Sequence, residues 1–156
     1  MWYIHPIQVS IDVPESREAV YDFLDIQANH ELFTDHMMRD WRCEGPERGV
    51  GSKVRVNAVL GRRKEPIEIE VIEAEPPERS VERNIGAGGK RVATGTYTLT
   101  ELPDGGTHIA FQYAWQKIPL SERLASPIIR PVMRRASQRA MQRLAEQLQA
   151  LEIADS

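Results

Sequence analysis

Apolar and polar residues alternate over residues 7–13, and this period of two predicts a strand with one buried face. Pro14 ends the strand and suits the first turn of a helix, where a missing backbone N–H costs little. Apolar residues then recur at helical spacing as far as Leu24, and a second short helix is expected over residues 28–36, with Phe33 as its only aromatic residue. The chain is therefore predicted to open with one strand and two short helices.

Between residues 39 and 116 the pattern changes to short alternating runs separated by turns rich in glycine and proline. The segment from Pro103 to Gly106 is a strong hairpin signal. In the strand that follows it, four residues at alternate positions share one face: Ile109, Phe111, Tyr113 and Trp115. About six antiparallel strands are expected in this part of the chain, which makes about seven in the whole sheet.

An amphipathic helix is expected to close the chain, running to about Leu151. Pro127 and Pro131 predict a break or kink in its first turns. Beyond them one face is apolar and comprises Ile129, Met133, Ala136, Ala140, Leu144 and Leu151. One long helix is thus available to cover the apolar face of the sheet, and the sheet should curl around it. This order of elements predicts an α+β fold, with residues 1–156 as a single domain.

The composition changes this picture little. The chain has 156 residues, with 41% hydrophobic and 28% charged residues, which is typical of a globular domain and excludes a disordered chain. Its longest apolar run, residues 1–4, is too short for a membrane-spanning helix or for the apolar region of a secretion signal. Cys43 is the only cysteine, which excludes an internal disulfide and favours a reducing, cytoplasmic location.

Charge is unevenly distributed. The net charge is −3, so the chain as a whole is not built to neutralise a nucleic acid backbone, and no nucleic acid partner is expected. Residues 121–151, however, carry six arginines and two glutamates. Such a basic helix is either a solvated face or a surface for an anionic partner.

Several segments, taken in order, resemble the START/Bet v 1-like (SRPBCC) superfamily, in particular its bacterial polyketide cyclase/dehydrase-type members. These segments are Val9–Pro14, Arg17–Leu24, Leu32–His36 leading to Trp41, Gly49–Gly51, Val71–Pro77, Gly95–Leu99 and Asp104–Phe111 ahead of the last helix. The resemblance covers residues 7–151. It implies a helix-grip fold, in which a curved antiparallel sheet wraps around the C-terminal helix and leaves a cavity between them. It also implies a family that mostly binds hydrophobic small molecules, some members cyclising or dehydrating poly-β-keto chains.

The inner face of the predicted sheet offers the best candidate for a ligand site. Aromatic residues give it an apolar wall, and the Tyr hydroxyl and Trp N–H groups add hydrogen-bonding capacity. Ala136 and Ala140 on the facing helix are too small to fill the space. A ligand-sized cavity is expected there, and a closed core in which the aromatics pack together is the alternative. The candidate ligand-binding residues are Phe33, Trp41, Tyr97, Phe111, Tyr113, Trp115, Met133, Ala136 and Ala140.

Candidate catalytic residues are few. Arg83 is in register with Val81 and Ile85, so it either points inward, where it could polarise a carbonyl and stabilise an enolate, or pairs with an acid at the surface. Tyr113 and His36 are weaker candidates, since His36 could line the mouth of the cavity. The histidines and Cys43 have no recognisable metal-ligand spacing, so neither a metal nor a cofactor is expected.

Three functions remain open from the sequence. The first is binding of a hydrophobic or aromatic small molecule, polyketide- or lipid-like. The second is a polyketide aromatase/cyclase or dehydratase that uses arginine, tyrosine and histidine groups of the pocket. The third is a protein-interaction module without a ligand, which the basic terminal helix alone supports. A homodimer is also left open.

Overall fold

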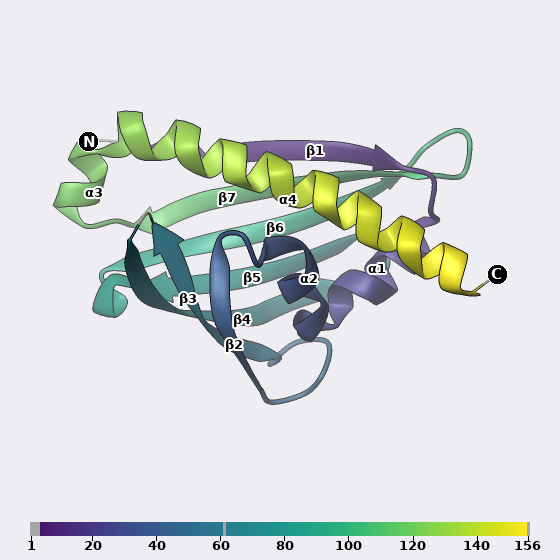
Figure 1. The fold of residues 1–156 in the computed structure, drawn as a ribbon, viewed down its shortest axis with the longest axis horizontal. Coiled ribbons are helices and arrows are strands. Elements are labelled where there is room, and N and C mark those ends of the chain that lie inside the picture. The colour runs from purple at the N-terminus through teal and green to yellow at the C-terminus, as the bar shows by residue number, and fades with distance from the viewer. Residues whose placement is uncertain (1–3, 61, 156) are drawn as a thin grey trace.

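The computed structural model describes residues 4–60 and 62–155 (Figure 1). Its elements, in chain order, are β1 (Ile7–Val13), α1 (Arg17–Asp25), the 3₁₀ turn η1 (Gln27–His30), α2 (Glu31–Thr34), β2 (Met38–Glu44), β3 (Lys53–Leu60), β4 (Arg63–Glu75), β5 (Arg79–Gly86), the 3₁₀ turn η2 (Ala87–Gly89), β6 (Arg91–Glu101), β7 (Thr107–Lys117), α3 (Leu120–Leu124) and α4 (Ser126–Asp155).

The strands form one antiparallel sheet in the order β1-β7-β6-β5-β4-β3-β2. The sheet curves, and α4 crosses its inner face diagonally beside β1, while α1, η1 and α2 cover the opposite end of the same face (Figure 1). This arrangement confirms the predicted α+β helix-grip fold, with seven strands and short helices after the first. Strands β2 to β7 each pair with the next strand along the chain, and β1 pairs with β7. The long helix α4 is then available to cover the apolar face of the sheet.

The first helix begins later than the proline signal indicates. Its N-cap is Ser16, whose side chain accepts a hydrogen bond from the Ala19 N–H at 3.2 Å. Pro14 lies before this cap and outside the first helical turn, so that detail of the prediction is wrong. The cap satisfies one of the free N–H groups at the helix end. It starts a helix whose buried face includes Val20 and Phe23.

The C-terminal helix is interrupted at Ala125, between α3 and α4, and not at either proline. Pro127 lies in the first turn of α4, where its missing N–H costs little, and Pro131 is inside the continuous helix. The buried face of α4 runs through Ala140, Met141, Leu144 and Leu148. Leu151 lies beside Leu148 on the same side of the helix, but it is 46% exposed near the end of α4.

Two clusters make up the hydrophobic core. The larger one joins the inner faces of β1, β6 and β7 to α1 and α4, and the smaller one is built on β3 and β4 around Val54, Val56 and Ile69. Alternate residues of β6, from Arg91 to Leu99, are buried. The inner face is therefore well defined along the central strands, and it is against this face that the candidate site lies.

Candidate functional site

A small cavity lies between the inner face of the sheet, the short helices and α4. Its volume is about 40 Å³. One half of its wall is polar and comprises Gln27, His30, Thr34, Glu82, Tyr97 and Ser137. The other half is apolar and comprises Met37, Met38, Trp41, Ile69, Phe111, Ala140 and Met141. Such a volume holds a few water molecules, whereas pockets for organic ligands measure several hundred Å³.

Bulky side chains explain why the cavity is small. Ala140 is one of the small residues that the sequence places opposite the sheet. The space in front of it is bordered by Met37, Met38, Met141 and the indole of Trp41. Methionine is unbranched and flexible, and it fills irregular gaps readily. The ligand-sized hollow expected from the sequence is therefore absent from this conformation, since these side chains occupy the space.

Glu82 is the most unusual group in the cavity wall. It lies on β5 opposite Gly95 of β6, and its side chain is 7% exposed. The absence of a side chain at Gly95 makes room for it, because a β-carbon there would be 3.1 Å from the Cγ and from the Oε1 of Glu82. Within the described residues its side chain accepts one hydrogen bond, from Gln27 Nε2 to Oε2 at 3.4 Å. Burial raises the pKa of Glu82 to about 7.

Two amides near Glu82 keep buried atoms without partners. Gln27 Oε1 and Asn84 Nδ2 make no hydrogen bond within the described residues. Gln27 is 3% exposed and Asn84, the next inward position of β5, is 7% exposed. Because buried polar atoms in native proteins are nearly always paired, such atoms point to a site that another molecule or water occupies. We refer to Gln27, Glu82 and Asn84 below as the polar trio.

His30 borders the same cavity but is fixed and neutral. Its Nε2 donates to the Leu24 carbonyl oxygen at 2.7 Å, and its ring meets that of Tyr97 edge-on at 5.7 Å. Burial lowers the pKa of His30 to about 4. Burial and the nearby Glu82 raise the pKa of Tyr97 well above its usual range. At neutral pH, therefore, Glu82 is the titratable group of the cavity that changes its charge.

Tyr113 and Trp115 lie on the inner face of β7, but they belong to a different cluster. Arg91 donates to Glu65 of β4 and to Glu122 of α3, each at 2.5 Å, beside Tyr113. Burial raises the pKa of Tyr113 to about 12, and its ring packs edge-on against Trp115 at 5.1 Å. This arginine-centred cluster closes the sheet end under α3 and does not border the 40 Å³ cavity.

The other candidate ligand-binding residues fall into two groups. Trp41, Tyr97, Phe111 and Ala140 line the cavity. The remaining three lie outside its wall: Phe33 is fully buried in the core, and Met133 and Ala136 are half-buried along α4.

The candidate catalytic residues Arg83 and His36 lie away from the cavity. Of the two placements open for Arg83, the structure has the surface one, because its side chain is 43% exposed and lies 4.0 Å from Glu70. His36 connects α2 to α4, with Nε2 3.0 Å from the Ala136 carbonyl oxygen and Nδ1 2.9 Å from Arg143. An enzymatic function built on Arg83 thus loses its main residue.

Reasoning from the sequence missed Glu82. Alternation with Val81 and Ile85 placed Glu82 and Asn84 on the face opposite to these two residues. The register of β4 is irregular between Val71 and Glu73, opposite Val81 and Glu82, and both of these β5 residues are buried. Bulges of this kind redirect side chains next to functional sites. The available signal was in the facing strand, where positions 93 and 95 are alanine and glycine and leave room for larger partners.

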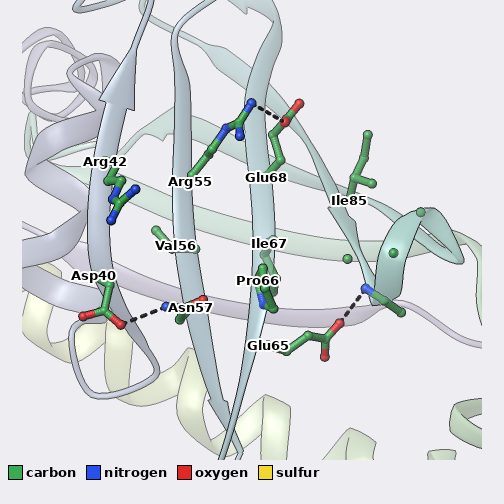
Figure 2. Close-up of a pocket in the computed structure, with 14 residues that line it drawn as sticks. Asp40, Arg42, Arg55, Val56, Asn57, Glu65, Pro66, Ile67, Glu68 and Ile85 are labelled. Atoms are coloured by element: carbon green, nitrogen blue, oxygen red, sulfur yellow. Dashed lines mark hydrogen bonds and ion pairs between the residues drawn. The ribbon is translucent and has the colours of Figure 1, made fainter.

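A larger groove of about 530 Å³ lies on the outer face of β2–β5, beside η2. Several polar groups of its wall pair with one another, as Figure 2 shows for Arg55 with Glu68 at 3.7 Å and for Asn57, which donates to Asp40 at 2.9 Å. The groove is wide and open, and most of the polar groups in its wall have hydrogen-bond or ion-pair partners. These features are those of a solvated surface, and the internal cavity is the better candidate site.

Neither a membrane-spanning helix nor a metal cluster is found in the described part of the chain. Every helix there is too short or too polar to cross a bilayer. Among residues 4–60 and 62–155, no three histidine, cysteine, aspartate or glutamate side chains gather as metal ligands would.

A curved seven-stranded antiparallel sheet that grips one long C-terminal helix defines the START/Bet v 1-like class. Within it, the chain belongs to the polyketide cyclase/dehydrase and lipid transport family, whose profile matches residues 5–149. No curated protein sequence matches the chain.

Solved structures share this fold at low sequence identity. TTHA0849 from Thermus thermophilus has a TM-score of 0.76 at 17% identity, covering 94% of this chain and 99% of its own. The KanY protein has a TM-score of 0.74 at 11% identity, covering 96% and 99%. Ara h 8.0201 has a TM-score of 0.64 at 13% identity, covering 94% and 98%.

Proposed function

We propose that this protein binds a hydrophobic small molecule, polyketide- or lipid-like, between the sheet and α4. The observation that carries the proposal is the polar trio: Gln27 and Glu82 border the cavity, Gln27 Oε1 is buried without a partner, and Asn84, just behind the cavity wall on β5, keeps a second unpaired atom. Leaving a buried polar group unpaired costs about 1–3 kcal/mol, so a ligand that pairs with these atoms recovers that energy on binding. The family description, which names polyketides and lipid transport, supports the same ligand class.

Binding requires that the cavity enlarge. The groups that restrict it are three methionines and Trp41, which stand on β2, on the turn before it and on α4. Met37 and Met38 join a four-residue helix to the edge strand β2, whose pairing with β3 is irregular between Arg39 and Arg42. Side chains of this kind move at low cost, because methionine has several rotamers of similar energy. The proposed ligand displaces them and takes their place against Ala140.

The trio sets the chemistry of the ligand's polar end. Glu82 donates a hydrogen bond to a carbonyl when it is protonated and accepts one from a hydroxyl when it is ionised. With a pKa of about 7, both forms are populated near neutrality. The proposed ligand therefore has an apolar body and one oxygen-bearing end that faces Glu82 and Gln27.

One observation favours catalysis as a second candidate function. A buried carboxyl group that titrates near neutrality is suited to general acid–base chemistry. In a cyclase or dehydratase, ionised Glu82 would accept a proton from the carbon next to a ketone, and the Tyr97 hydroxyl would lie in the same cavity. Arg83 has no part in this version. A cytoplasmic location, favoured by the exposed free thiol of Cys43, suits either function.

Native mass spectrometry and thermal-shift screening test the proposal. The ligand panel comprises polyketides, flavonoids, sterols, fatty acids and quinones, with the wild type compared against Ser137→Leu and Glu82→Gln. Ser137 is buried in the cavity wall, so the larger leucine should occupy the cavity and abolish binding. Glu82→Gln should weaken binding at least about tenfold, the value of one lost hydrogen bond to a charged group.

The matched control is Glu68→Gln, a half-buried acid on the outer face of β4 whose change should leave binding intact. The proposal is wrong if no panel member binds, or if ligands bind Ser137→Leu as tightly as the wild type. Turnover of a bound polyketide by the wild type but not by Glu82→Gln would establish the second candidate function.

A further inference from the structure

Four aliphatic side chains stand out from the surface where α3 meets α4. Leu120, Leu124, Ile128 and Val132 are 68%, 62%, 73% and 56% exposed. They follow one another at intervals of four residues, and both helical segments lie at the same end of the molecule, at the left of Figure 1. A contiguous run of exposed aliphatic residues is typical of an interaction surface, because monomeric proteins seldom expose apolar side chains in clusters.

Arginines continue the same helix face. Arg135 and Arg139 come three and seven residues after Val132, both are exposed, and neither pairs with an acid in the described part of the chain. Arg134 beside them is likewise unpaired there. Between residues 123 and 145 the chain contains no acid at all.

We propose that this end of the molecule docks on the surface of an anionic lipid bilayer. We name its exposed residues the docking face: Leu120, Leu124, Ile128, Val132, Arg135 and Arg139. Helices that lie in a bilayer interface combine aliphatic side chains, which enter the acyl boundary, with arginines that contact lipid phosphates. This docking is independent of the proposed ligand, although it would bring the sheet end under α3 close to the lipid.

The chemistry of the docking face disfavours the other occupants. A second copy of the chain in a two-fold contact would bring the same arginines against each other, because such an interface pairs a patch with itself. A protein partner commonly meets aromatic anchors, and this face has none, whereas four aliphatic side chains suit a fluid hydrocarbon boundary. Charge complementarity then selects lipids with negative headgroups.

Co-sedimentation with vesicles tests the docking. The full chain is mixed with vesicles of phosphatidylcholine alone or of phosphatidylcholine with about 30% phosphatidylglycerol. The wild type should bind the anionic vesicles, lose at least about tenfold in affinity when salt rises from about 0.1 to 0.5 M, and bind the neutral vesicles weakly. Leu124→Ser with Ile128→Ser, and Arg135→Gln with Arg139→Gln, should each reduce binding at least about tenfold.

Two control variants test whether the effect is specific to the docking face, because they change exposed residues elsewhere on the surface. Val50→Ser removes an aliphatic side chain that is 59% exposed on the β2–β3 turn, and Arg42→Gln removes an exposed arginine of β2. Both should bind like the wild type, and circular dichroism checks that every variant is folded. The proposal is overturned if anionic vesicles fail to bind the wild type or bind the double variants equally well. It is also overturned if soluble polyglutamate binds the protein as tightly as vesicles do, or if the double variants instead convert a dimer to a monomer in light scattering.

Discussion

Gly95 lies directly opposite Glu82 in the β5–β6 pairing, and the glutamate side chain occupies the space that a β-carbon at position 95 would need. The same β-carbon would lie 3.1 Å from Phe111 Cε1. Position 95 thus holds the cavity's acid and one of its aromatic walls in place. Position 95 has to be glycine because Glu82 and Phe111 pack against it and leave no room for a β-carbon.

Gly95→Ala should therefore displace Glu82 and destabilise the fold by about 1–3 kcal/mol, the cost of overpacking a buried site. Urea unfolding measures this change. Thr96→Ala, on the outer face of the same strand, is the control and should cost less than about 1 kcal/mol. Equal effects of the two substitutions would contradict the close approach of Gly95 and Glu82.

The pH dependence of stability should report the buried acid. The folded-state pKa of Glu82 is raised to about 7 from an ordinary value of 4.5, so the folded state binds the proton more tightly than the unfolded state. The contribution of this group is greatest below pH 4.5, falls as pH rises towards 7 and is constant above it. The loss amounts to about 3 kcal/mol, since each pH unit of difference is worth about 1.4 kcal/mol.

Glu82→Gln should remove that loss. The difference in free energy of unfolding between variant and wild type, measured by urea titration at intervals from about pH 5 to 8, should rise in favour of the variant with increasing pH. Glu68→Gln, whose wild-type acid pairs with Arg55 and Lys53 at the outer face, provides the control and should give a flat difference. A flat difference for Glu82→Gln as well would show that Glu82 does not titrate in this range.

His30 should act in the opposite direction. Burial lowers its folded-state pKa to about 4 from 6.5, so the folded state binds the proton more weakly than the unfolded state. Its contribution is fully present above pH 6.5 and is lost as pH falls towards 4. His30→Gln should cost stability at every pH through the lost contact with Leu24, but the cost should shrink by about 3 kcal/mol between pH 6.5 and 4.

His108→Gln serves as the comparison for that series, because His108 is partly exposed and pairs with Asp12 at the surface. Urea unfolding at matched pH values distinguishes the two histidines. A cost of His30→Gln that stays the same from pH 6.5 to pH 4 would mean that His30 is not held neutral by burial.

The sequence predicts the order of strands and helices well, because each element shows in the spacing of its apolar residues. Strict alternation over residues 7–13 matches β1, and the aromatic face of β7 packs on the core as its spacing indicates. Local irregularity is harder to predict. At β5 the period-two rule selects Val81 for the inner face, whereas the register shift in β4 leaves Val81 and Glu82 both buried.

The size of the cavity also lies beyond sequence patterns. Ala140 lines the cavity, whereas Ala136 does not, and the volume left in front of Ala140 depends on the side-chain positions of Met37 and Met141. Those positions follow from packing in three dimensions, where a single rotamer change alters the free volume. For the same reason, the two unpaired amides of the polar trio could not be inferred before the strands were paired.

Arg91 and Glu122 provide the last prediction, because their ion pair holds α3 against the end of the sheet. Arg91 is 9% exposed and also binds Glu65, so the arginine stays paired when α3 moves away. Glu122→Gln should therefore destabilise the whole fold by only about 1 kcal/mol while it loosens α3 selectively. Hydrogen exchange followed by mass spectrometry should show faster exchange over residues 120–124 and unchanged exchange in β6. Arg91→Met removes the shared partner of two acids and should instead cost about 3 kcal/mol or more and increase exchange in β4 and β6 as well. If the two substitutions had the same local effect, α3 would be held by contacts other than this ion pair.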